Sequence, residues 1–146
     1  DFMHTIVDLS EIYKGQVAAS KRGIAVVDKK QVMIRDEIET LGKETTIRWT
    51  MLTPAEVTII NDHQALLTKD GKTLTLDVGK LPNLKMKTWS TDPPNAYDAP
   101  NPGTILTGFE VTVPANTKIA LNVRLIPGKK GKSNQKNMLA LENWKN

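Results

Sequence analysis

Apolar and polar residues alternate along much of this chain with the period of two that is typical of β-strands. The alternation is clearest over residues 73–78 and 118–125. Because successive side chains of a strand point to opposite faces, each of these segments predicts a strand with one buried face. Shorter segments with the same period are residues 21–28, 32–38, 47–51, 57–59 and 109–113.

Turn-forming sequences separate these segments. Asp70 and Gly71 predict a tight hairpin, since both central positions of a type I′ turn need positive φ. Residues 32–41 are the one helical candidate, but their β-branched residues and two-residue period favour a strand. The pattern predicts about ten strands in an all-β, antiparallel β-sandwich, because a single sheet would leave an apolar face in water. The predicted core residues are Ile24, Val26, Ile34, Trp49, Leu74, Leu76, Leu121 and Val123.

The division of the chain into domains follows from its length and its turns. We expect residues 1–62 to end one layer of a larger β-sandwich and residues 63–146 to form a small C-terminal β-sandwich. A single domain is the alternative, since 146 residues can bury one core. Residues 8–16 are predicted to be extended, and no sequence signal before them marks the start of a strand or helix. We therefore expect the chain to begin inside a fold.

Composition narrows the range of functions. The chain has no cysteine, which excludes disulfides, thiolate metal sites and cysteine nucleophiles. Its net charge of +4 is small and it has no recognition motif, so we expect no nucleic-acid partner. It also lacks an apolar run long enough to span a membrane as a helix. The basic residues 127–137 predict a mobile loop, with contact to a polyanion as the alternative.

Candidate catalytic groups are few. The only histidines are His4, in a predicted strand, and His63, in a polar turn, and neither lies in a motif that supplies a serine and a carboxylate. Zinc needs three or four clustered donors, whereas His63 has one neighbouring carboxylate. Asp36 shares a face with apolar residues, so we expect a structural partner such as Arg22, Arg35 or a backbone donor. We predict no catalytic residue, no metal site and no cofactor.

One predicted strand has a basic and aromatic face. Lys85, Lys87 and Trp89 lie on one side of it because they are two residues apart. An indole can stack on a sugar ring while ammonium groups bind carboxylate or sulfate, so these residues form a candidate site for an acidic glycan. In the alternative, the proline-rich residues 92–102 cover the sheet edge, Tyr97 packs over Trp89 and the lysines are merely solvated.

A series of segments runs in order along almost the whole chain. They are VDLS at 7–10, YKGQ at 13–16, KRGIAVVD at 21–28, VMIRDEI at 32–38, RWTMLT at 48–53, FEVTVPA at 109–115 and VRLIP at 123–127, with Trp144 near the end. This ordered series resembles the C-terminal β-domain region of heparinase II/III-like polysaccharide lyases.

The resemblance implies the kind of enzyme to which this segment belongs and the catalytic groups that the segment lacks. Enzymes of this family have a helical toroid followed by β-sandwich layers. They cleave uronic-acid polysaccharides by β-elimination, in which a base removes the C5 proton and a tyrosine-type acid serves the leaving oxygen. Those groups, and the metal ligands of some members, belong to upstream segments, and neither Tyr13 nor Tyr97 lies in a matching motif. We therefore expect this chain alone to lack lyase activity, to have the upstream catalytic domain as its partner, and to be secreted or periplasmic.

Three functions of different classes follow. The favoured one is a non-catalytic C-terminal β-sandwich of a lyase for acidic polysaccharides, with a structural or cleft-supporting role. The second is a stand-alone carbohydrate-binding module for acidic glycans. The third is a complete small hydrolase or lyase, which the shortage of acid–base groups disfavours.

Overall fold

The computed structural model of the protein describes residues 2–128 and 139–144. These residues form ten β-strands and one short 3-10 helix, and they contain no α-helix. The elements are β1 (Phe2–Asp8), β2 (Val17–Val27), β3 (Gln31–Thr40), β4 (Thr45–Thr53), β5 (Glu56–Asn61), β6 (Gln64–Lys69), β7 (Lys72–Val78), β8 (Lys85–Trp89), β9 (Ile105–Val113), β10 (Lys118–Pro127) and η1 (Leu141–Asn143). The all-β class predicted from the period of two is confirmed.

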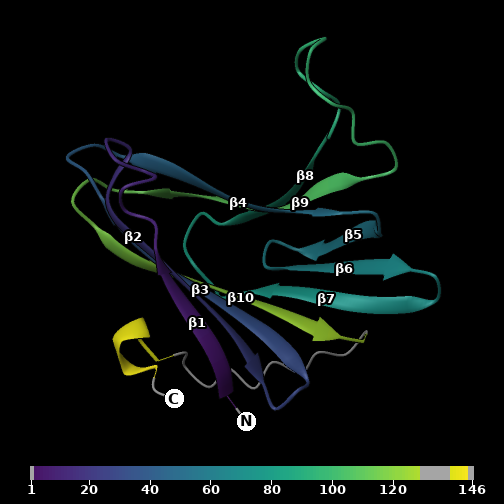
Figure 1. The fold of residues 1–146 in the computed structure, drawn as a ribbon, viewed down its shortest axis with the longest axis horizontal. Coiled ribbons are helices and arrows are strands. Elements are labelled where there is room, and N and C mark those ends of the chain that lie inside the picture. Colours follow the sequence, from purple (N-terminus) through teal and green to yellow (C-terminus); the bar gives the residue numbers. More distant parts are fainter. Residues whose placement is uncertain (1, 129–138, 145–146) are drawn as a thin grey trace.

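The strands form two antiparallel sheets that pack as a β-sandwich (Figure 1). The larger sheet has seven strands in the order β1-β2-β3-β10-β7-β6-β5, and the smaller has three in the order β4-β9-β8. The larger sheet takes strands from both sides of residue 62, since β5 pairs with β6 and β3 pairs with β10. The division into residues 1–62 and 63–146 stays a prediction.

The hydrophobic core lies between the two sheets. The rings of Trp49 in β4 and Phe109 in β9 stack with their centroids 5.8 Å apart, and they are among the core residues that the smaller sheet contributes. Predicted core residues that lie in this core or pack against it are Ile34, Trp49, Leu74, Leu76, Leu121 and Val123. Alternation along the strands therefore identified most of the buried face correctly.

The prediction for the inner face of β2 is wrong. Ile24 is 40% exposed, and Val26 is only partly buried. Ile24 pairs with Ile34 of β3, so both side chains lie on the same face of the larger sheet. Among the described residues, however, the core cluster includes Ile34 and takes no residue from β2. The smaller sheet thus covers this face only as far as β3.

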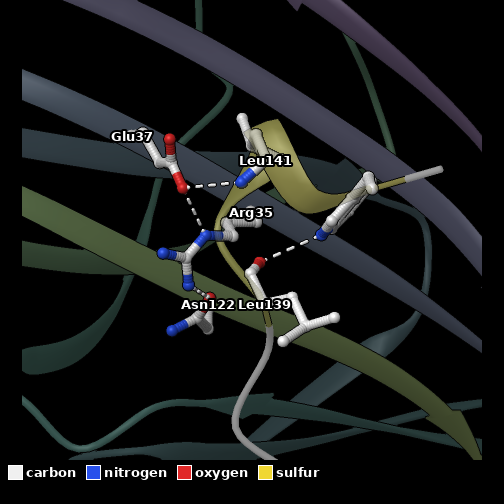
Figure 2. A network of polar contacts seen from close by, with 6 residues as sticks. Arg35, Glu37, Asn122, Leu139 and Leu141 are labelled. Carbon is white, nitrogen blue, oxygen red and sulfur yellow. Dashed lines mark hydrogen bonds and ion pairs between the residues drawn. The ribbon is translucent and has the colours of Figure 1, made fainter.

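The opposite face of the larger sheet is covered near β2 by η1. Leu141 and Trp144 are buried there, and Gly23 leaves room for them, because a Cβ at residue 23 would lie 2.7 Å from the Trp144 ring. Figure 2 shows the polar contacts of this turn: Oε1 of Glu37 accepts hydrogen bonds from the backbone N–H of Leu141 at 2.9 Å and from Nε of Arg35 at 2.7 Å. The turn is thus held by both apolar and charged groups.

Asp36 is buried and paired, as expected. Its carboxylate accepts hydrogen bonds from Nε of Arg22 at 2.6 Å and from Nη2 of Arg22 at 2.9 Å. This pairing raises the pKa of Arg22. Arg35, the other arginine proposed as a partner, instead binds Glu37 and the side chain of Asn122. A bidentate arginine satisfies a carboxylate that burial would otherwise destabilise, so Asp36 has a structural role.

Candidate functional site

The candidate glycan-binding residues lie on β8, at one edge of the smaller sheet. Lys85 and Lys87 are exposed, Trp89 is half-buried, and Met86 between the lysines is buried in the core. The alternation that predicted a shared face is therefore present in the structure. This face is the outer surface of the smaller sheet, opposite the core.

Strand pairing brings two further charged residues to this face. In β9, which lies beside β8, Glu110 is opposite Lys85, Gly108 is opposite Lys87, and Leu106 is opposite Trp89. The same Glu110 is opposite Arg48 of β4 on its other side. Directly opposed residues share a face of the sheet.

We call the surface formed by Arg48, Lys85, Lys87, Trp89 and Glu110 the basic face. Arg48 and Glu110 were not predicted as site residues from the sequence. Their positions within alternating segments indicated outward-facing side chains, but only the register shows that they lie beside β8.

Glu110 is the charged centre of the basic face. Its Oε1 accepts a hydrogen bond from Nε of Arg48 at 2.9 Å, and its Oε2 accepts one from the ammonium group of Lys87. These bonds, the one from Lys87 first and then the one from Arg48, lower the pKa of Glu110 because they stabilise the carboxylate. Two cations thus share one carboxylate, and the three side chains together carry one positive charge.

Lys85 pairs with a residue other than Glu110. Its ammonium group lies 2.8 Å from Oδ2 of Asp62, in the turn between β5 and β6, and both side chains are more than half exposed. An exposed pair of this kind contributes about 0–1 kcal/mol. Lys85 is therefore held weakly and adds less to the positive charge of the basic face than its sequence position indicated.

Arg48 also contacts the indole of Trp89. Its Cζ lies 4.8 Å from the ring centroid, a distance at which a cation is attracted to the face of an indole. Arg48 is opposite Glu110 whereas Trp89 is opposite Leu106, and the position between these two in β9 is Gly108. A Cβ at Gly108 would collide with the backbone of Trp49 in β4. This position requires glycine, and no side chain there separates the guanidinium from the indole.

The loop after β8 does not cover Trp89, so the alternative based on Tyr97 is wrong. Residues 90–104 project away from both sheets (Figure 1), and the side chain of Tyr97 is 86% exposed. The base of the loop is closed by hydroxyls: Oγ1 of Thr91 donates to the Thr104 carbonyl at 2.9 Å, and Oγ1 of Thr104 donates to the Asn101 carbonyl at 2.7 Å. The loop is closed on itself, which explains why it does not fold back over the strand.

The histidines are far apart in the fold. The ring of His4 lies 5.1 Å from that of Phe2 and 5.6 Å from that of Trp144, whereas His63 lies in the turn between β5 and β6. Within residues 2–128 and 139–144, no group of three or more His, Cys, Asp or Glu side chains could hold a metal ion.

The described segments also include no helix long and apolar enough to cross a membrane. The basic stretch from Lys129 to Lys136 proposed for polyanion contact lies outside the described residues.

Comparisons with known proteins identify similar folds. No protein-family model matches the chain, and no curated protein matches it. A heparinase III structure is 19% identical with a TM-score of 0.55 over 77% of this chain, and its form with methylated lysines is 17% identical with a TM-score of 0.57 over 88%. Heparan sulfate lyase HepC from Pedobacter heparinus is 11% identical with a TM-score of 0.56 over 79%. The chain spans 18–20% of the length of these proteins. Its fold is therefore that of one segment of heparinase III and heparan sulfate lyase structures, as the sequence resemblance implied.

Proposed function

We propose that this chain is a non-catalytic β-sandwich portion of a polysaccharide lyase for acidic polysaccharides. In this proposal it packs against the catalytic part of a longer polypeptide, supports the substrate cleft and is secreted or periplasmic. The match to about a fifth of the length of lyase structures supports a role as one part of a larger protein. The observation that carries the proposal is an exposed apolar surface on the larger sheet.

This surface is formed by Met3, Val7 and Ile24, and we call it the apolar face. Met3 is opposite Val26, and Val7 is opposite Arg22, so both point to the same side of the sheet as Ile24. The three side chains are 71%, 48% and 40% exposed. They continue the inner face of the larger sheet beyond the region that the smaller sheet covers.

The apolar face is suited to contact with more protein. Complete burial of a side chain such as Met, Val or Ile contributes roughly 1.5–3 kcal/mol, so three of them together can support a stable contact. Ile12 and Tyr13, in the segment that follows β1, are also exposed and can extend it. We assign the catalytic part of the same polypeptide as the occupant, because the matched lyases are more than four times as long as this chain.

The test compares the same substitutions in two contexts, namely the 146-residue chain and the complete reading frame that contains it. Met3→Lys and Ile24→Lys should change the melting temperature of the 146-residue chain little, because exposed substitutions usually alter stability by less than about 0.5 kcal/mol. In the complete protein, where the face is buried, each should lower the melting temperature by several degrees, as a buried lysine is costly.

Ile60→Lys is the matched control, since Ile60 is 56% exposed on β5 at the other edge of the sheet. It should have the same small effect in both contexts. Equal effects of Ile24→Lys in the short and the complete protein would contradict the proposal, and so would a reading frame that encodes only these residues.

A stand-alone carbohydrate-binding module is the second candidate. The basic face favours it, because cations and an indole lie together on an exposed sheet surface. The two candidates use different surfaces of the molecule.

A further inference from the structure

We propose that the basic face binds an anionic carbohydrate, with Arg48 and Lys87 holding a carboxylate or sulfate and Trp89 stacking against the sugar ring. The choice of a carbohydrate rests on the proposed function. The choice of an anion rests on the geometry of the face alone.

The charged groups are layered so that the cations face the solvent. The side chains of Arg48 and Lys87 are 56% and 46% exposed, whereas that of Glu110, which both of them bind, is only 19% exposed. The carboxylate therefore lies beneath the two cations and leaves one positive charge uncompensated. An anion that approaches from solvent meets N–H donors before it meets the carboxylate.

Donors remain for such an anion. The described bonds from Arg48 to Glu110 use its Nε and Nη2 groups, and a guanidinium has a further amino group in the same plane. The ammonium group of Lys87 has three N–H bonds, and one contact to Glu110 is described. Arginine binds carboxylate and sulfate in a fixed planar geometry, and lysine adds a point charge.

Arg48 is already held in place. Glu110 fixes its Nε end, and the indole of Trp89 lies against its guanidinium. Because a side chain that is ordered before binding loses less entropy on binding, this arrangement lowers the cost of capturing a ligand. Gly108 lies on the same face and adds no side chain beside the guanidinium and the indole.

The ligand class follows from these groups together. An indole binds the apolar C–H face of a pyranose, and the cations bind the acidic substituent, so a uronate or sulfated sugar matches both. A neutral sugar would leave the cations unused. Nucleic acid binding usually depends on neutralising many phosphates, whereas this face has one uncompensated charge.

The test is a titration of the 146-residue chain at low salt with a heparin-derived octasaccharide. A neutral oligosaccharide of equal length and a short single-stranded RNA serve as comparison probes. The Kd for the octasaccharide should lie in the millimolar-to-micromolar range and rise with salt, because exposed charges are screened over roughly 10 Å. Trp89 should report binding by its fluorescence, since Trp49 and Trp144 are both buried.

The variants separate the basic face from general electrostatic attraction. Arg48→Gln, Lys87→Ala and Trp89→Ala should each weaken binding by about fivefold or more. Lys72→Ala removes the same charge from an exposed position on β7 and should leave the Kd unchanged. Glu110→Gln removes the competing negative charge while it keeps an oxygen that can accept the bond from Nε of Arg48, and it should tighten binding several-fold, which a merely structural role would not do.

The proposal is overturned if Lys72→Ala weakens binding as much as Lys87→Ala, if Trp89→Ala has no effect, if the RNA binds as tightly as the octasaccharide, or if no binding occurs at millimolar octasaccharide. None of these outcomes affects the proposal that the apolar face packs against the catalytic part of the polypeptide, because the test of that proposal uses Met3 and Ile24. Conversely, if the melting-temperature comparison fails to support packing of the apolar face, the octasaccharide titration still tests the basic face.

Discussion

Leu121 lies at the centre of the larger sheet. It belongs to β10, it is 1% exposed, and it packs in the core between the sheets. Leu121→Ala should lower the free energy of unfolding by roughly 2–5 kcal/mol, because it removes buried apolar area and leaves a cavity. Urea denaturation would measure this effect. Leu52→Ala is the control, since Leu52 is 50% exposed, and an unchanged midpoint for Leu121→Ala would show that its environment is not packed.

Ile24 and Asp36 show what alternation can and cannot predict for a single residue. The period of two correctly placed both on the inner face of the larger sheet. For Asp36 this was enough to predict burial and a partner, either an arginine or a backbone donor, because a buried carboxylate needs a hydrogen-bond donor. For Ile24 it was not enough, since the extent of the smaller sheet decides which part of the face is covered, and that extent depends on contacts distant in sequence.

The 3-10 helix η1 is anchored by a titratable group, Glu37 of β3. Burial raises the pKa of Glu37, but hydrogen bonds from Arg35 and from the N–H of Leu141 outweigh this, so the pKa is lowered from its usual value of 4.5. A group whose pKa is lower in the folded protein stabilises it above the unfolded pKa, and this stabilisation is lost as the pH falls through the folded pKa.

Glu37→Gln should therefore lower the melting temperature at neutral pH, and the difference from wild type should shrink as the pH falls below about 4.5. Thermal unfolding between neutral and acidic pH would measure this. Glu56→Gln, on the edge strand β5, is the control. A difference between wild type and Glu37→Gln that stays constant with pH would show that the charge of Glu37 does not hold η1.

The strand β8 was predictable, but the site around it was only partly so. Lys85, Lys87 and Trp89 follow from spacing within one segment. Arg48 and Glu110 come from segments far along the chain, and only the order β4-β9-β8 brings them to β8. One of the two alternatives for residues 92–102 was a cover over the strand, based on their prolines, whereas the closure of the loop depends on hydrogen bonds between threonines at its two ends.

At the scale of the whole molecule, the described residues provide two separate exposed surfaces, the apolar face and the basic face. We predict that the purified 146-residue chain releases no unsaturated uronide from heparin, heparan sulfate or alginate, because β-elimination needs a positioned base and acid. Absorbance of the unsaturated product would be followed over time, with an active polysaccharide lyase as the positive control. A rise in absorbance that heating of the protein abolishes would contradict the prediction.

The order of strands in the larger sheet also affects how the chain folds as it is synthesised. Among the described strands β10 comes last in the sequence, yet it lies in the middle of the sheet, between β3 and β7. Until β10 emerges, β3 and β7 each have an unpaired edge, and such edges can pair with other chains. Contacts between distant segments also form slowly. This sheet is therefore most prone to aggregate just before β10 leaves the ribosome, when a chaperone that shields strand edges would help most.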